Sequence, residues 1–104
     1  MSFQWTEHSQ LQAARRNLTH DEIEYVLFYA QRYHRAGVVI YFLRESDLPV
    51  GDRSRAFATR LVGTAVVMAR DRRTIITVWR NRRSGLKHIL RKLDRTRNHA
   101  DYWL

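Results

Sequence analysis

The longest unbroken apolar run in the chain is Val38-Val39-Ile40-Tyr41-Phe42-Leu43. It is rich in β-branched and aromatic residues and is apolar on both alternating faces, which is typical of a strand covered on two sides. The run is far too short to span a bilayer. We therefore expect a buried strand here, within a sheet that has packing partners on both faces.

A helix is predicted before this strand. Thr19-His20-Asp21-Glu22 is a capping box, in which the Thr19 hydroxyl accepts from the Glu22 amide and the Glu22 carboxylate reaches back. Apolar residues then recur at helical spacing, which predicts a helix to about Tyr33; they are Ile23, Val26, Leu27 and Ala30.

A shorter helix is predicted upstream, from about Glu7 to Arg16. Its Leu11 and Ala14 are expected to face the same core, and Asn17 suits a left-handed C-terminal cap. Residues 1–36 are therefore expected to form a helical hairpin.

An antiparallel sheet is predicted across residues 37–81. After a loop at residues 45–59, strands are expected at 60–69 and 74–80, joined by a polar turn at 70–73. Apolar residues at helical spacing predict a basic helix at 84–97, followed by a tail at 98–104. The expected fold class is α+β in a single domain, with a helical hairpin, a three- or four-stranded antiparallel sheet and a C-terminal basic helix.

The composition excludes several classes of functional site. The chain has no cysteine, which excludes disulfides, thiolate metal sites and cysteine nucleophiles. The start Met-Ser-Phe-Gln-Trp lacks the regions of a signal peptide, so we expect a cytoplasmic location and no membrane partner. No close histidine pair with a carboxylate is present, and we expect no metal site and no cofactor.

The charge is unevenly distributed along the chain. Residues 53–104 carry 14 Arg/Lys against 3 Asp/Glu, a net +11, while residues 1–52 carry 5 against 7, a net −2. Such an excess attracts a polyanion, and 17 of the 19 basic residues are arginine, whose planar fork matches phosphate oxygens. Nucleic acid is the first partner that this pattern indicates.

The predicted nucleic-acid-binding residues lie in the second half of the chain. A solvated helix face, a membrane surface and an acidic protein partner are the alternative explanations for these charges. The near absence of acids between residues 80 and 97 favours an anion-binding face. The residues are Arg72, Arg73, Arg82, Arg83, Lys87, His88, Arg91, Lys92 and Arg95.

Phosphodiester chemistry without metal is the reaction class that the residues favour. The chain has no Gly-rich phosphate loop, no nucleophile elbow and no convincing carboxylate pair. RNA cleavage needs a base for the ribose 2′-hydroxyl, cations for the developing charge and an acid for the leaving oxygen. Histidine and arginine suffice for these roles.

The segment His8-Ser9-Gln10-Leu11-Gln12-Ala13-Ala14-Arg15-Arg16-Asn17-Leu18-Thr19 resembles the opening of the domain of unknown function 4258 family. Members read His-Ala-x-x-Arg-x-x-x-Arg-Gly-Ile-Ser/Thr before a helix. His8, Arg16, Leu18 and Thr19 match, whereas Gln12 replaces the first Arg and Asn17 the Gly. Residues 75–81 are also similar to a later strand of the family, which often ends in Thr-Val-Tyr-Arg.

That family resembles the RelE and BrnT type toxins, which cut RNA without metal and are silenced by an antitoxin. The resemblance implies a RelE/BrnT-like fold, RNA as substrate, free or ribosome-bound, and an acidic antitoxin protein. It also implies a catalytic set, with His8 in proton transfer, two arginines near the scissile phosphate and two residues as hydrogen-bonding support: His8, Arg16, Arg80, Thr77 and Asn81.

Structural roles remain open for each of these residues. His8 could cap or pack the first helix, Arg16 could pair with Glu22 or Asp21, and Thr77 could serve the strand alone. Three functional hypotheses therefore stand: a metal-independent endoribonuclease of toxin-antitoxin type, a non-catalytic nucleic-acid-binding module, and a protein-interaction domain with an acidic partner.

Overall fold

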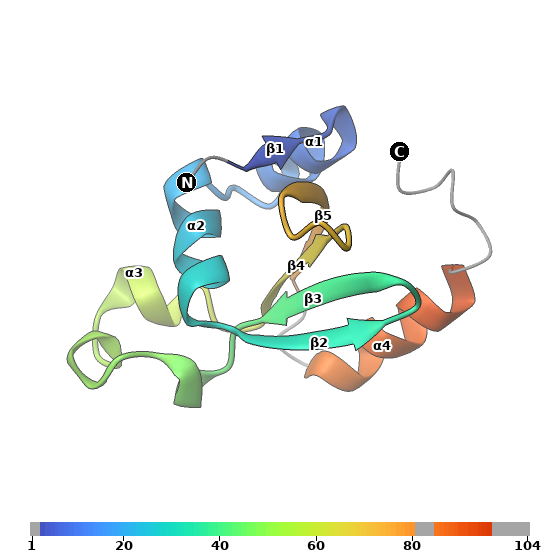
Figure 1. Cartoon of the computed structure of the whole chain (residues 1–104). Helices are drawn as coiled ribbons and strands as arrows, with labels where there is room; N and C mark the ends of the chain where they lie inside the picture. The colour runs from blue at the N-terminus through green and yellow to red at the C-terminus, as the bar shows by residue number, and fades with distance from the viewer. Residues whose placement is uncertain (1–2, 81–84, 97–104) are drawn as a thin grey trace.

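The computed structural model describes residues 3–80 and 85–96. Figure 1 shows the arrangement of the elements. In chain order they are β1 (Gln4–Trp5), α1 (Glu7–Arg15), α2 (His20–Tyr29), β2 (Gln31–Arg35), β3 (Val38–Phe42), the 3-10 turns η1 (Glu45–Asp47) and η2 (Val50–Asp52), α3 (Ala56–Thr59), β4 (Thr64–Met68), β5 (Thr74–Arg80) and α4 (Gly85–Thr96).

Within the described ranges, the strands form one five-stranded sheet in the order β1-β5-β4-β3-β2. β2 to β5 are successive antiparallel neighbours, and β1 lies parallel to β5. The predicted α+β class is confirmed. The sheet is mixed and differs from the predicted three or four antiparallel strands because β1 and β2 were not expected.

β3 is buried along its whole length, as its apolar pattern predicted. Ile23 and Val26 of α2 pack with Val39 and Tyr41 on one side of the sheet. On the other side, a second cluster contains Ile40, Phe42 and Trp79 and receives Leu86 and Leu90 of α4. Figure 1 shows α2 and α4 on opposite sides of the β2–β3 hairpin. The sheet is therefore covered by helices on both faces.

The predicted start of α2 is confirmed. The Thr19 amide donates to Glu22 Oε1 at 2.9 Å, and the Glu22 amide donates to Thr19 Oγ1 at 3.1 Å. Asn17 has φ of 56°, the left-handed conformation expected of a residue that ends α1. Both features depend on neighbouring residues alone, which is why they could be predicted from the sequence.

The end of α2 was predicted incorrectly. The helix ends at Tyr29, Ala30 is extended, and Gln31–Arg35 form β2. All five residues of β2 pair with β3. The physical reason is the tight turn at Ala36 and Gly37, which folds residues 31–35 back onto a strand that already needs a neighbour.

α1 packs differently from its predicted face. Leu11 is 50 % exposed and Ala14 is exposed, whereas Ser9 and Ala13 are buried. α1 lies against β5, and the small side chains of its buried face let the helix approach the strand closely. The expectation that Leu11 and Ala14 face the core was therefore wrong.

α1 also covers the outer edge of β5. β1 pairs only with Thr74 and Ile75, so the remainder of that edge needs other partners. Thr6 Oγ1 donates to the Ile75 carbonyl at 3.3 Å, and Arg16 Nε donates to the Val78 carbonyl at 3.1 Å. The two ends of α1 thus satisfy edge carbonyls of β5.

The strand predicted at 74–80 is confirmed as β5, whereas other predicted elements are shorter than expected or divided. The strand predicted at 60–69 is β4 at Thr64–Met68, and the loop at 45–59 contains η1, η2 and α3. The basic helix corresponds to α4. Its predicted ends at residues 84 and 97, and the tail at 98–104, lie outside the described residues.

The β2–β3 turn provides a test of the hairpin. Ala36 and Gly37 both have positive φ, 53° and 80°, as a two-residue type I′ turn requires. An L-residue other than Asn or Gly is disfavoured there by about 1 kcal/mol. We expect Ala36→Asn to raise the free energy of unfolding by about 0.5–1 kcal/mol, because Asn tolerates this conformation. Urea denaturation measures the change.

Gly37→Ala is the matched control. No described atom outside the neighbouring residues lies within 4 Å of a Cβ at this position, so only backbone strain would act. It should lower the free energy of unfolding by about 1 kcal/mol. A stabilising Gly37→Ala, or a destabilising Ala36→Asn, would contradict the turn assignment.

Candidate functional site

The candidate site is built where α1 crosses β5. His8, in the first turn of α1, places Nε2 3.2 Å from Oγ1 of Thr77 on β5. Thr77 is fully buried and His8 half-buried. The hydroxyl restricts the orientation of the imidazole ring. Two of the predicted catalytic residues, 69 positions apart, are therefore in contact.

Arg16 reaches the next residue of β5. Its Nε donates to the Val78 carbonyl at 3.1 Å, and the side chain is half-buried. Along the part of the chain that is described, no hydrogen bond involves its two terminal nitrogens. The alternative role for Arg16, pairing with Glu22 or Asp21, is not found among the described residues; Glu22 pairs with Arg60 instead.

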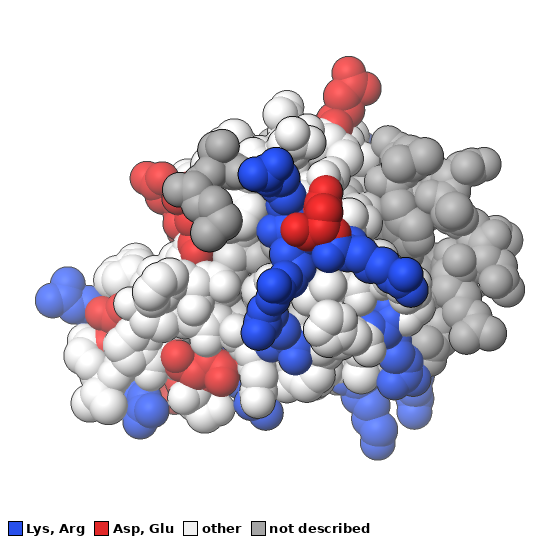
Figure 2. Space-filling model, in the orientation of Figure 1, with Lys and Arg blue, Asp and Glu red and all other residues white. Residues whose placement is uncertain are grey.

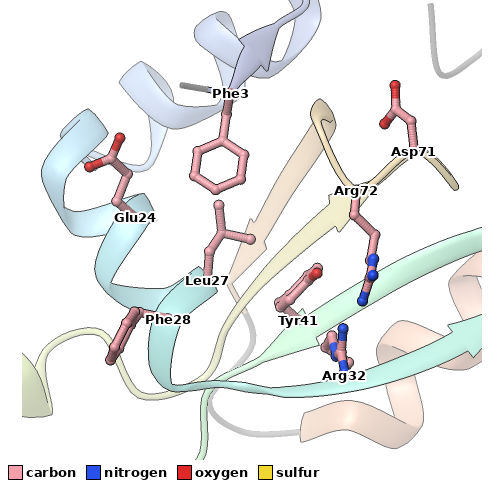
Figure 3. Close-up of a pocket in the computed structure, with 8 residues that line it drawn as sticks. All are labelled: Phe3, Glu24, Leu27, Phe28, Arg32, Tyr41, Asp71 and Arg72. Carbon is pink, nitrogen blue, oxygen red and sulfur yellow. The ribbon is translucent and has the colours of Figure 1, made fainter. Parts of the chain in front are cut away.

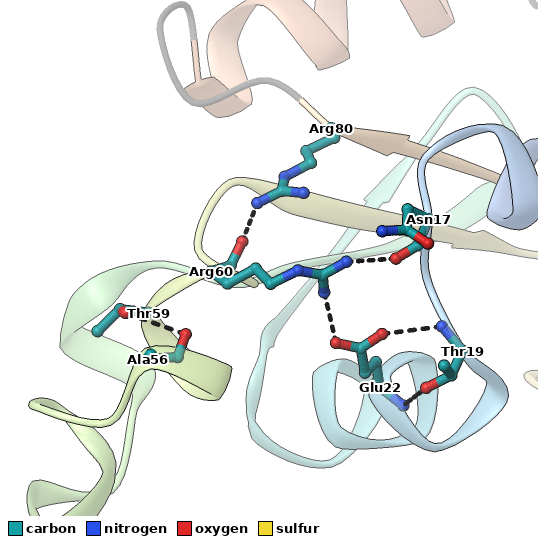
Figure 4. Close-up of polar contacts among 7 residues, drawn as sticks. All are labelled: Asn17, Thr19, Glu22, Ala56, Thr59, Arg60 and Arg80. Atoms are coloured by element: carbon teal, nitrogen blue, oxygen red, sulfur yellow. Dashed lines mark hydrogen bonds and ion pairs between the residues drawn. The ribbon is translucent and has the colours of Figure 1, made fainter.

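Arg80 lies at the other end of β5 and bonds to backbone. Its guanidinium donates to the Arg60 carbonyl, while the Arg60 guanidinium contacts both the Glu22 carboxylate and the Asn17 carbonyl (Figure 4). Glu22 is also the carboxylate of the capping box. Arg60 therefore joins the start of α2 to the end of β5, a link between distant residues that no local pattern indicated.

The predicted nucleic-acid-binding residues fall into two described groups. Arg72 and Arg73 are exposed in the β4–β5 turn, and Lys87, His88 and Arg91 are exposed on α4. Figure 2 shows Lys and Arg gathered over the middle of one face, across the β2–β3 hairpin and the β4–β5 turn. For Lys92 and Arg95 only the backbone is described; the predicted Asn81, Arg82 and Arg83 fall outside the described residues.

Asp71 shapes the basic turn. Its carboxylate accepts from the Arg73 amide at 2.8 Å and from the amide and hydroxyl of Thr74 at 3.0 and 2.9 Å. The hydrogen bond from the Thr74 amide, followed by that from Arg73, holds the pKa of Asp71 below its ordinary value. The carboxylate of this turn is thus hydrogen-bonded to the backbone of the turn itself.

Arg32 and Arg35 are basic residues that the prediction missed. Both are exposed on β2, a strand that was expected to be part of α2. The Ala36-Gly37 pair directly before the apolar run at Val38 is the signal that would have indicated a turn between two strands.

Other features of the described part of the chain bear on chemistry. It contains no cluster of three His, Cys, Asp or Glu that could hold a metal ion. Tyr25 donates to Asp52 at 2.7 Å, and burial together with this carboxylate raises the pKa of the phenol.

No helix in the described ranges combines the length and apolar character needed to cross a membrane.

Comparisons with models of known protein families, with curated proteins and with solved structures find no match for this chain.

The turn at Asp71 has a testable pH dependence. A carboxyl whose pKa is lowered by folding stabilises the protein above its unfolded pKa, about 4, and this stabilisation is lost as pH falls through the folded value. We expect Asp71→Ala to lower the melting temperature at pH 7 and the difference from wild type to shrink below about pH 4. Thermal denaturation between pH 2.5 and 7 measures it. An equal difference at both ends of that range would contradict this role.

Proposed function

We propose that this protein is a metal-independent endoribonuclease of toxin-antitoxin type. The observation that carries the proposal is the contact between His8 Nε2 and Thr77 Oγ1, beside the Arg16–Val78 contact. The imidazole of His8, in the first turn of α1, and the guanidinium of Arg16, the C-cap of the same helix, thereby contact consecutive residues of β5. Such a pairing of a proton-transfer group with a cation is what metal-free RNA cleavage needs.

The proposed reaction is transesterification within RNA. His8 takes the proton of a ribose 2′-hydroxyl while the 2′-oxygen forms a bond to the adjacent phosphorus. The bond from phosphorus to the 5′-oxygen breaks, and water protonates that oxygen. The products are a 2′,3′-cyclic phosphate and a 5′-hydroxyl. The terminal nitrogens of Arg16 supply the positive charge for the phosphorane oxygens, and Thr77 positions the imidazole.

The proposed RNA surface contains α4. Lys87, His88 and Arg91 are exposed on this helix, and the chain carries a net charge of +9. Cations on one helix spaced by about 1.5 Å per residue can follow a phosphate backbone. The exposure of these three side chains supports binding of an RNA strand beside the end of β5.

The proposal includes a RelE/BrnT-like framework. The α1–α2 hairpin precedes four successive antiparallel strands, β2 to β5, which is the order that the resemblance implies.

A second candidate is binding of RNA without cleavage. The guanidiniums of Arg16 and Arg80 both donate to backbone carbonyls, and Gln12 stands where the resembled family has an arginine. Guanidiniums that donate to backbone carbonyls favour a structural role. The experiments below separate the two candidates.

Cleavage is tested with the full chain and total RNA in EDTA. We expect fragments that end in cyclic phosphate, and we expect His8→Ala to lower the rate at least about 100-fold, because general base catalysis contributes that much. Thr77→Val should lower the rate less and shift the pH profile, because the imidazole loses its positioning contact.

His20→Ala is the control, since His20 stacks on Trp5 at 4.1 Å between ring centroids and has no proposed role in cleavage. It should cleave as wild type does. Absence of cleavage by the wild type, or full activity of His8→Ala, removes the enzymatic proposal; binding that persists in that case supports the second candidate.

Binding is tested by titrating a fluorescent single-stranded RNA at several salt concentrations. We expect the Lys87→Ala, Arg91→Ala double variant to bind more weakly and to reduce the slope of log K against log salt by about 1.4, since each lost phosphate contact contributes about 0.7. Arg44→Ala, Arg55→Ala is the control, because both side chains are exposed in the β3–β4 connection. An unchanged slope in the α4 variant argues against this RNA surface.

A further inference from the structure

Among the residues that the structure describes, no strand pairs with the outer backbone edge of β2, called here the free edge. β2 is the last strand of the sheet within the described ranges, and Arg35 pairs with Val38 across the two-residue turn. In such a hairpin, Arg35 and Tyr33 exchange hydrogen bonds with β3, so the amides and carbonyls of Arg32 and His34 point outward. No described residue hydrogen-bonds to these four groups. They are available to an added strand.

A pocket of about 560 Å³ lies beside Arg32 on this edge. Arg32 pairs with Tyr41 of β3, which also lines the pocket. Figure 3 shows the Arg32 and Arg72 side chains extending toward one another near Tyr41. The apolar lining of the pocket comes from four residues: Phe3, Leu27, Phe28 and Tyr41.

Two carboxylates, those of Glu24 and Asp71, also line this pocket, but neither forms an ion pair with Arg32 or Arg72 within the described residues. Asp71 is bonded to the backbone of its own turn, and Figure 3 shows Glu24 and Asp71 directed away from the guanidiniums of Arg32 and Arg72. No hydrogen bond or ion pair of either arginine side chain occurs in the described structure. Two cations that line the same pocket and have no ion-pair partner among the described residues favour an anionic ligand.

A second basic pocket lies two residues further along the same edge. It has a volume of about 240 Å³ and is lined by His34 and Arg70 among others. His34 and Arg32 are alternate residues of β2 and share a face of the sheet. Alternate residues of a strand added at this edge would therefore meet one basic pocket and then the other.

A group of contacting aromatic side chains begins at Phe28, which lines the larger pocket. Phe28 is 79 % exposed and packs edge-on against Tyr29, which contacts Tyr25. Tyr25 in turn contacts Phe57, which is 46 % exposed. Aromatic residues together with arginine are the composition enriched in protein interfaces.

We propose that the free edge of β2 binds an extended acidic segment of a protein partner as an additional strand. Its main chain pairs with Arg32 and His34. One acidic side chain lies at Arg32 and Arg72, the alternate one lies at His34 and Arg70, and an apolar side chain enters the larger pocket beside Phe28. Main-chain pairing supplies affinity, and the pockets supply specificity. The proposal does not depend on RNA cleavage.

A protein strand fits this edge better than a second copy or a nucleic acid. Two copies joined through β2 would set Arg32, His34 and Arg35 against the same residues, and like charges opposite one another destabilise a sheet. A nucleic acid can neutralise the arginines, but it cannot reproduce the regular ladder that the outward groups of Arg32 and His34 require.

Selection from a random peptide library displayed on phage, against the full chain, is the first test. We expect enriched peptides with acidic residues at alternate positions and an apolar neighbour. Synthetic peptides from the selection are then used in amide hydrogen exchange by NMR. Exchange at Arg32 and His34 should slow about tenfold or more, whereas Tyr33 and Arg35, already paired with β3, should not change. Failure to enrich such peptides, or unchanged exchange at Arg32 and His34, overturns the proposal.

Charge reversal separates specific docking from general attraction. The Arg32→Glu, Arg72→Glu variant should bind the selected peptides at least about tenfold more weakly. Arg15→Glu, Arg55→Glu makes the same charge change at two exposed positions away from this edge and should bind as wild type does. Equal loss in both variants, or equally slowed exchange at Arg32 and His34 when a ten-residue oligouridylate is added in place of the peptides, also overturns the proposal.

Discussion

The burial of β3, β4 and β5 on both faces is the constraint from which this structure is built. A strand apolar on both alternations must be covered from two sides, and here α2 and α4 provide that cover. α1 instead lies along the part of the β5 edge that β1 does not cover, where the residues at its two ends donate hydrogen bonds to strand carbonyls. The contact between His8 and Thr77 follows from that position of α1.

Features with a local cause could be predicted from the sequence. The capping box at Thr19 and the strand from Val38 depend on neighbouring residues, and both were predicted. β2 was missed because the choice between helix and strand at residues 31–35 is made by pairing with β3, which overrides local preference. β1, with two residues, depends on the distant β5 in the same way.

The candidate site shows the same division. The resemblance selected His8, Arg16 and Thr77; His8 contacts Thr77, 69 positions away, and Arg16 contacts the carbonyl of Val78, 62 positions away and next to Thr77 on β5. Charge counting identified the basic turn and α4, but it did not indicate the link from Arg60 to Glu22 or the approach of Arg32 to Arg72 in Figure 3. Both depend on which strands become neighbours.

Arg60 connects the start of α2 to the end of β5, so local unfolding at these two places is coupled. Its side chain contacts Glu22 and the Asn17 carbonyl, and its own carbonyl receives Arg80. When the first turn of α2 frays, the Glu22 carboxylate leaves both the Thr19 amide and the Arg60 guanidinium, so the connection that supports Arg80 loosens in the same event. The start of α2 and the end of β5 therefore belong to one cooperative unit, so the stability of this end of the sheet depends on contacts made by the first turn of α2.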